Sequence, residues 1–435
     1  MPYTPAYFTS LTLRDVRCFG GEQTLDLRDR DGNPAKWTII LGENGVGKTT
    51  LLQCLDRISP FAWETRRPGA LGGTFPKNAP HESAHELVRV ELHACSMSAE
   101  MSTGHLISDT IGPAALLTMD LKITADGRAP ASQYPNLSIR MHCCGYGAAR
   151  RPGAAKLAAA ERSDSAATLH SEHETLVDVE EWLLQLDYAA KSNAALRGRF
   201  ERVKQILIDL LPDITDIRIV GFEREPAAPA VELHSPFGWI RPRQVSLGYR
   251  AMMTWVVDLA SRMFAAFPTS PDPLREATVV LIDEIDLHLH PRWQRDLINY
   301  LDRHFPNVQF IATAHSPLVV QAAQGANIVV LHRDGDRVVI DNDPQSVEGW
   351  RIDQILTSDL FGLPSARPPH NEALIAERRR LLGQPSLSPE DQARLGQLDA
   401  QIGALPQGET ADDIHALETI RRFAATLRDR EQTGT

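Results

Sequence analysis

Short apolar runs and amphipathic stretches alternate along most of the chain. Apolar runs between turn residues predict strands at 8–13, 23–27, 37–41, 277–282, 308–314 and 328–331. Amphipathic spacing predicts helices from 48 to about 58, at 249–264 and at 293–304. Because strands that alternate with helices form mainly parallel sheets covered on both faces, we expect an α/β fold.

Three other segments depart from this alternation. Apolar runs at 88–94, 116–123 and 137–143 predict an antiparallel β insertion. Leu196, Phe200, Val203, Leu207 and Leu210 recur at steps of four and three and predict an amphipathic helix, with a second helix before it near Trp182. The pair lacks sustained heptads, which excludes a long coiled-coil arm. Beyond Asp343, three short helices are expected at 374–382, 395–402 and 414–427.

Composition narrows the class of protein. The 45 Lys and Arg against 56 Asp and Glu give a net charge of −11, which excludes a pervasively basic nucleic-acid coat and leaves a local basic patch. Five cysteines without a CxxC pair indicate neither a disulfide framework nor a common zinc site, so a reducing compartment is expected. With no secretory signal at the start and no uncharged apolar run, we expect a cytoplasmic protein without a membrane segment.

The strongest chemical motif is the sequence GENGVGKT at 42–49, between a predicted apolar strand and a predicted helix. Glycines let backbone N–H groups converge on phosphate oxygens, Lys48 would reach the β- and γ-phosphates, and the Thr49 hydroxyl would hold Mg²⁺. The motif predicts ATP and Mg²⁺ as cofactors. The candidate ATP-binding residues are Gly42, Asn44, Gly45, Val46, Gly47, Lys48, Thr49 and Thr50.

The second motif is an apolar strand that ends in Asp283 and Glu284. Such a strand would deliver Asp283 to the metal, while Glu284 would polarise water for attack on the γ-phosphate. Two acids at a strand end can also be a solvated terminus, but the phosphate loop favours the catalytic interpretation. His315 follows a further apolar strand, where it could contact the γ-phosphate or the attacking water.

The third motif, Ser246-Leu-Gly248, lies at the start of a predicted helix and would form a second anion site. The chain already has a phosphate loop. We therefore expect Ser246 and Gly248 to serve ATP that is bound to another subunit.

In this order the motifs resemble those of the ATP-binding-cassette ATPases, over residues 8–60 and 235–335. In that family two heads enclose two ATP molecules. The resemblance implies that Ser246, Gly248 and Arg250 act across a homodimer or higher homo-oligomer, that Asp283 and Thr49 hold Mg²⁺, that Glu284 is the general base and that His315 is the switch histidine. It also places Asp286 in the D-loop, which links the two sites, and His288 and His290 in the same turn rather than at a metal.

Details of the motifs point to one branch of this superfamily. The signature Ser-Leu-Gly-Tyr-Arg differs from the Ser-Gly-Gly-Gln of transporters, and the sequence DEIDLHLHP at 283–291 resembles the RecF, SMC and OLD group. No clear Q-loop glutamine follows the first helix, and residues 145–150 occupy about its place, where Arg150 or Tyr146 could substitute for it. Phe19 lies in a segment that approaches adenine in RecF-like heads, so it would stack on the base or, equally, belong to the core.

The resemblance also implies a division of the chain. We expect the N-terminal half of an ATPase head at 1–153 with a β insertion at about 60–137, a short helical arm at 154–234, the C-terminal half of the head at 235–345 and a helical region at 346–435. A compact head without a nuclease domain resembles the stand-alone ATPases of antiphage systems, such as the Septu-type, retron-associated and PARIS ATPases. These work with a separately encoded effector, often a nuclease.

We therefore expect an ATP-dependent sensor and scaffold that holds a nuclease effector. The alternative is a RecF-like repair clamp that binds DNA directly, and a transporter ATPase ranks third. The basic residues Arg197, Arg199, Arg202 and Lys204, and 378–380 in the tail, are candidates for contact with DNA or RNA, although such runs are commonly solvated.

Overall fold

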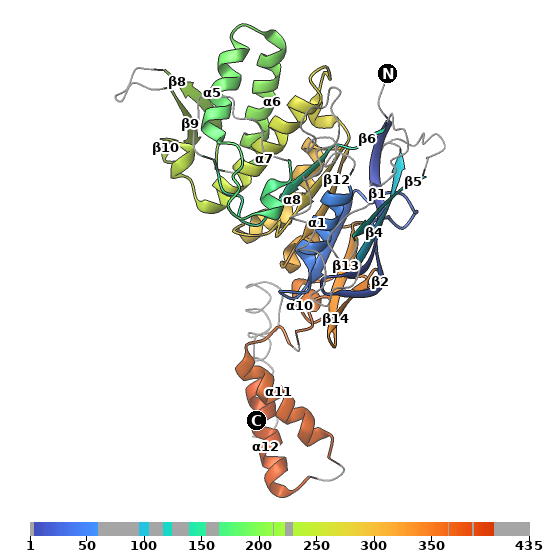
Figure 1. Ribbon diagram of the computed structural model, residues 1–435. Helices are drawn as coiled ribbons and strands as arrows, with labels where there is room; N and C mark the ends of the chain where they lie inside the picture. The colour runs from blue at the N-terminus through green and yellow to red at the C-terminus, as the bar shows by residue number, and fades with distance from the viewer. Residues whose placement is uncertain are drawn as a thin grey trace. The chain divides into compact units, whose positions relative to one another are not determined.

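The structure is a computed structural model (Figure 1). It describes residues 4–59, 95–103, 116–123, 139–153, 165–211, 213–221, 229–363, 365–384 and 387–403. The strand expected at 88–94 and the helix expected at 414–427 lie outside these residues. The chain forms two compact units, Met1–Phe361 and Gly362–Thr435.

The centre of the first unit is a six-stranded sheet. Its strands are β3 (Trp37–Gly42), β7 (Cys143–Tyr146), β11 (Thr278–Ile282), β12 (Val308–Thr313), β13 (Asn327–Asp334) and β14 (Arg337–Asp341). The spatial order is β14-β13-β3-β12-β11-β7, and every neighbouring pair is parallel except β13 with β14. The structure confirms the predicted α/β fold with a mainly parallel sheet.

Helices and a second sheet cover the two faces of this sheet. The helices are α1 (Lys48–Ile58), α7 (Leu247–Ala266), α8 (Pro291–His304), α9 (Pro317–Ala322) and α10 (Ile352–Leu356). Successive side chains of a strand point to opposite faces. Accordingly, Val280 and Ile282 join the apolar cluster that contains α7 and α8, while Val279 and Leu281 join the cluster that contains α1.

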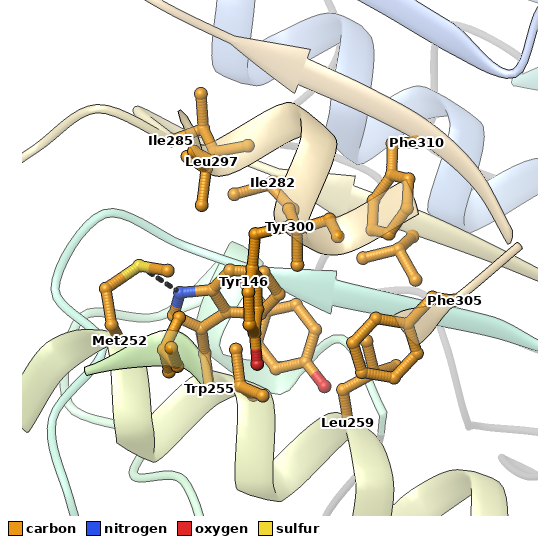
Figure 2. Close-up of a cluster of buried hydrophobic side chains, with 14 of the residues drawn as sticks. Tyr146, Met252, Trp255, Leu259, Ile282, Ile285, Leu297, Tyr300, Phe305 and Phe310 are labelled. Atoms are coloured by element: carbon orange, nitrogen blue, oxygen red, sulfur yellow. Dashed lines mark hydrogen bonds between the residues drawn. The ribbon is translucent and has the colours of Figure 1, made fainter. Parts of the chain in front are cut away.

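Figure 2 shows the first of these clusters, to which Trp255 and Leu259 of α7 and Ile282 and Phe310 of the sheet belong. The Trp255 indole N–H donates to the sulfur of Met252 at 3.2 Å, so its polar atom is partnered inside the core. These side chains bury one face of the sheet against α7. The helix that carries the predicted signature is therefore fixed to the strand that carries the acids.

The second sheet is mainly antiparallel. It contains β1 (Thr4–Val16), β2 (Phe19–Asp26), β4 (Cys95–Thr103), β5 (Leu116–Ile123) and β6 (Ile139–Arg140), in the order β2-β1-β4-β5 with β6 beside β1. The strand predicted at 137–143 is divided: β6 pairs with β1, whereas Cys143 begins β7 and pairs with β11 in the central sheet.

The arm consists of short helices and a small sheet (Figure 1). Its helices are α4 (Ala167–His170), α5 (Val179–Ala190) and α6 (Ala194–Leu210), and its strands are β8 (Asp216–Val220), β9 (Ala230–Ser235) and β10 (Gly238–Ile240). Asp178 and Asn193 cap α5 and α6 by accepting hydrogen bonds from backbone N–H groups in the first turn of each helix. Two 3₁₀ turns, η2 (Pro242–Gln244) and η3 (Pro273–Arg275), flank α7.

The second unit is described by two helices, α11 (Pro369–Leu382) and α12 (Pro389–Gly403). Leu381 and Leu398 are buried, and the Arg394 guanidinium donates to both carboxylate oxygens of Glu377, at 2.9 and 2.7 Å. The helices expected at 374–382 and 395–402 are thus present and are longer than their apolar spacing indicated. No helix in the described part of the chain is long and apolar enough to cross a membrane.

Candidate ATP site

Three neighbouring strands end at the same edge of the central sheet. The predicted phosphate loop follows β3, Thr313 ends β12, and Asp283 follows β11, with β12 lying between the other two. Because these strands are parallel, their carboxyl ends meet, as ligand sites of open α/β sheets require. The topology therefore brings the loop and the acidic pair together.

The phosphate loop enters α1 through Gly47. This residue is the N-cap of α1 and has φ 90°, in the left-handed region that side-chain-bearing residues avoid. A Cβ atom at Gly47 would also lie 2.5 Å from the Cys18 sulfur and 3.0 Å from the Phe19 ring. Two independent constraints thus require glycine at this entry, which leaves the first turn of α1 open toward a phosphate.

The remaining loop residues divide into exposed and buried positions. Asn44 and Gly45 are exposed, whereas the Val46 side chain is 1% exposed and anchors the loop to the α1-side core. Thr50 is buried, and its hydroxyl accepts a hydrogen bond of 3.1 Å from the Arg17 guanidinium. The loop therefore has a fixed base and an open rim.

The Lys48 side chain folds back on its own loop. Its ammonium donates to the carbonyl oxygens of Gly42 and Glu43 at 2.9 and 2.8 Å. Burial lowers the pKa of Lys48, and the nearby carboxylates of Asp283 and Glu284 oppose this effect. A cation held by two neutral carbonyls can exchange them for phosphate oxygens, which are stronger acceptors.

Two hydroxyl groups hold the buried Asp283 carboxylate. Its Oδ2 accepts from the Thr49 hydroxyl and its Oδ1 accepts from the Thr313 hydroxyl, each at 2.7 Å. Carboxylate and hydroxyl oxygens are ligands that Mg²⁺ prefers, and Mg²⁺ in such sites takes its other ligands from phosphate and water. Thr49 and Asp283 fit this ion. Among the residues described, no group of three or more His, Cys, Asp or Glu forms a metal cage.

The turn after β11 is held from both sides. Glu284 has φ 48°, its N–H donates to the Thr313 hydroxyl at 2.7 Å, and its carbonyl oxygen accepts from the Arg150 guanidinium at 2.7 Å. The Glu284 side chain is half-buried. The sequence motifs do not predict a role for Thr313. The feature that indicates one is its position as a polar residue at the carboxyl end of an apolar strand.

The segment after Glu284 is bonded to the segment that contains His315. The Asp286 carboxylate accepts from the His315 backbone N–H at 3.2 and 3.1 Å. Gln294 of α8 donates to the carbonyl oxygens of Asp286 and Leu289, and it accepts from the Ser316 hydroxyl at 2.6 Å. The His315 side chain itself is exposed at this edge. The predicted D-loop and switch-histidine segments thus form one hydrogen-bonded unit.

The two candidates for the missing Q-loop glutamine lie in different environments. The Tyr146 hydroxyl donates to Asp258 of α7 at 3.1 Å, within the apolar cluster of Figure 2, and burial raises its pKa well above the usual value. The Arg150 guanidinium instead donates to the carbonyl oxygens of Asp283 and Glu284, in the turn after β11 that we call the acid turn. Burial lowers the pKa of Arg150 to about 10, so its side chain remains a cation at neutral pH.

The predicted signature begins α7. Ser246 is exposed and caps the helix, accepting from the Tyr249 N–H at 3.4 Å, and Leu247 is 54% exposed. Gly248 is buried, and its backbone lies so near the carbonyl oxygen of His288 that a Cβ atom there would collide with it. In the described part of the chain no hydrogen bond joins Ser246 or Arg250 to the phosphate loop. The signature thus touches the D-loop of its own chain and turns its first residues outward.

Other candidates are placed away from ligand chemistry. The Phe19 side chain is fully buried in the cluster that contains α1, so the core alternative describes its position and stacking on adenine does not. His290 caps α8, where its Nδ1 accepts from the Arg292 N–H at 3.3 Å, and His288 lies in the left-handed turn with φ 63°. These histidines shape the turn.

The strand order, the glycine-rich loop before α1 and the acids after β11 define the class of protein: an α/β fold of the P-loop ATPase type. Two family descriptions match the chain, "AAA domain, putative AbiEii toxin, Type IV TA system" at residues 184–321 and "AAA domain" at residues 10–58. These matches cover the phosphate loop, the signature and the acidic pair.

Particular relatives narrow this class further. The chain is 30% identical over 272 residues to the "Retron Ec83 probable ATPase" of Escherichia coli, covering 62% of this chain and 47% of that protein. It is 26% identical over 401 residues to the "Septu protein PtuA" of Bacillus mycoides, covering 91% and 50%. The chain thus spans about half the length of these curated relatives. The resemblance to Septu and retron ATPases that the sequence indicated is confirmed.

The solved structures that resemble the chain include the SMC head domain from Thermotoga maritima, with 12% identity and a TM-score of 0.40. That match covers 78% of this chain and all of the other.

Proposed function

We propose that this protein binds and hydrolyses ATP between paired heads and acts as the sensor and scaffold of an antiphage system whose effector, a nuclease, is a separate protein. The observation that carries the ATPase proposal is the hydrogen-bonded chain from Thr49 through Asp283 and Thr313 to Glu284. It joins the phosphate loop to the acidic pair at one edge of the sheet.

Each residue of this edge has a chemical task in the proposed reaction. The backbone at Gly47 and the first turn of α1 hold the phosphates, and Lys48 transfers its hydrogen bonds from loop carbonyls to phosphate oxygens. Bound Mg²⁺ supplies positive charge that neutralises the charge developing on the phosphates. Glu284 accepts a proton from the attacking water, and His315 contacts the water or the γ-phosphate.

The exposed start of α7 supports pairing of heads. Ser246 and Leu247 face outward, while the phosphate loop of the same chain already has its own helix N-terminus. In the proposed dimer Ser246, Gly248 and Arg250 complete the site of the partner subunit. The contact between Gly248 and the D-loop carbonyl of His288 then connects the two sites.

The defence role rests on the Septu and retron relatives and on the resemblance described above. A clamp that binds DNA directly is less well supported, because several arm cations are engaged within the chain. Lys204 pairs with Asp216 at 2.7 Å, and Arg199 donates to the carbonyl oxygen of Pro268 and lies over the Phe264 ring. Fewer arm charges are left for phosphates.

The experiment is to purify tagged protein from its native host in parallel with the Lys48→Ala variant, and to assay both for ATPase activity. We expect the unaltered protein to hydrolyse ATP and to copurify with a nuclease. We expect the variant to lose turnover. Absence of a nuclease, together with tight and steeply salt-dependent DNA binding by the protein alone, would favour the clamp instead.

A further inference from the structure

Arg150 lies beneath the turn that carries the acidic pair. Arg150 is only 2% exposed. Its Nη2 donates to the carbonyl oxygens of both Asp283 and Glu284, at 2.5 and 2.7 Å. It reaches them from the segment after β7. Because β7 pairs with β11, and the Asp283 N–H donates to the Tyr146 carbonyl at 2.8 Å, this segment begins beside the acid turn.

Burial and backbone geometry oppose an arginine at position 150, whereas the two bonds and the nearby carboxylates of Asp283, Asp286 and Glu284 favour it. Its Nε and Nη1 atoms are buried and have no hydrogen-bond partner among the described residues, and its own backbone has φ 39°. Buried N–H groups without acceptors and side-chain-bearing residues in the left-handed region both destabilise the folded state. An apolar side chain would fill the same space without these costs. A buried arginine at this position therefore points to a function other than packing.

The two bonds act on the main chain of the proposed general base. Glu284 is held at its N–H by Thr313 and at its carbonyl oxygen by Arg150, and it lies in the left-handed region with φ 48°. With both peptide groups fixed, the backbone sets the direction of its Cα–Cβ bond, from which the carboxylate extends. A small rotation of this turn would move the carboxylate away from the attacking water. Catalysis is sensitive to displacements of this size.

We propose that Arg150 is a positioning residue for ATP hydrolysis, which fixes the main chain of Asp283 and Glu284 and thereby aims the Glu284 carboxylate. The inference rests on the proposed ATPase function. In this role Arg150 acts from below the acid turn and contacts neither ATP nor the attacking water.

The test compares Arg150→Lys and Arg150→Gln with Arg151→Lys, which changes the exposed neighbouring arginine in the same way. Lysine keeps the charge but lacks the planar guanidinium group, and glutamine keeps a planar NH2 group on a shorter, uncharged side chain. We expect kcat for ATP to fall about 100-fold in both Arg150 variants, as for a misplaced catalytic group. Equilibrium binding of ATP with Mg²⁺ should stay within about threefold of the unaltered protein. Arg151→Lys should change neither quantity.

A second measurement separates positioning from general structure. In a Glu284→Gln background, Arg150→Lys should lower the residual hydrolysis by less than about threefold, because the group that it positions is already absent. An unchanged kcat in the Arg150 variants, a full additional loss in the double variant, or unfolding of both Arg150 variants would overturn the inference. A complete lack of turnover in the unaltered protein is a different result, which would overturn the proposed ATPase and this role together.

Discussion

The carboxyl edge of the central sheet and the start of α7 carry the two halves of the proposed chemistry in different ways. At the sheet edge, Asp283 is 7% exposed and accepts hydrogen bonds from Thr49 and Thr313 within the same chain. At the start of α7, Ser246 is exposed and caps only its own helix. The order of the strands assembles the sheet edge within one chain, whereas the start of α7 faces outward.

This difference has a consequence for how substitutions should behave. Residues at the sheet edge are positioned by the fold, so we expect a substitution there to impair the site of the chain that carries it. Substitutions at the start of α7 are expected to impair the site of a partner subunit. In this account the sheet edge of one chain binds the phosphates, and the start of α7 of the partner chain completes the same site.

The largest effect is expected for Glu284→Gln. The variant removes the proposed general base but keeps the shape of the turn, so kcat should fall about 1,000-fold, within the range of general-base catalysis. ATP affinity should be retained, which equilibrium binding with Mg²⁺ would verify. A variant that hydrolyses ATP at the unaltered rate would remove the assignment of Glu284 as the base.

A comparable loss is expected for Ser246→Arg, but with a different rescue. The long side chain points outward, so the fold should tolerate it while the partner's site is blocked. Mixed with an equal amount of Lys48→Ala, it should regain part of the unaltered activity, because each mixed dimer contains one intact site. A mixture that remains inactive would contradict the exchange of signatures between subunits.

A smaller loss is expected for Thr313→Val, which tests the sheet edge itself. The substitution removes the donor to Asp283 and leaves the Glu284 N–H without its acceptor. We expect kcat to fall about tenfold and the free energy of unfolding to fall by about 1–3 kcal/mol, the usual range for an unpaired buried group. Thr313→Ser keeps the hydroxyl and should behave nearly as the unaltered protein in both assays.

The smallest effect is expected for Gln294→Ala, which loosens the D-loop without touching the acids. The variant loses the bonds to the Asp286 and Leu289 carbonyls and to the Ser316 hydroxyl. We expect kcat to fall by less than about fivefold, and Ser316→Ala to add little in the double variant because the two residues share one bond. Fully additive losses would show that Gln294 does not act through this bond.

Much of the sheet edge could be predicted because its motifs are local. The glycine-rich loop, Lys48 and the acids each lie directly after a strand that is apolar enough to recognise. The strand order was not encoded in any one segment. That order is what makes Thr313 a partner of Asp283, and in sequence a threonine at a strand end is unremarkable because β-branched residues favour strands.

Other features depend on contacts between distant segments. Arg150 and Glu284 are 134 positions apart, so neither the bond nor the choice of Arg150 over Tyr146 followed from spacing. Phe19 had two interpretations in the sequence, and only the packing against Gly47 distinguishes them. The hairpin of β13 and β14 was also missed, because the charged turn at Asp334–Arg337 interrupts the apolar pattern.

The central claim, that the exposed signature completes the site of a second subunit, is tested most directly by the mass of Glu284→Gln in solution. Light scattering after size exclusion should give the monomer mass without nucleotide and twice that mass with ATP and Mg²⁺. The same variant with Ser246→Arg should stay monomeric. If Glu284→Gln binds ATP with Mg²⁺ and remains a monomer at the same protein concentration, the claim is contradicted.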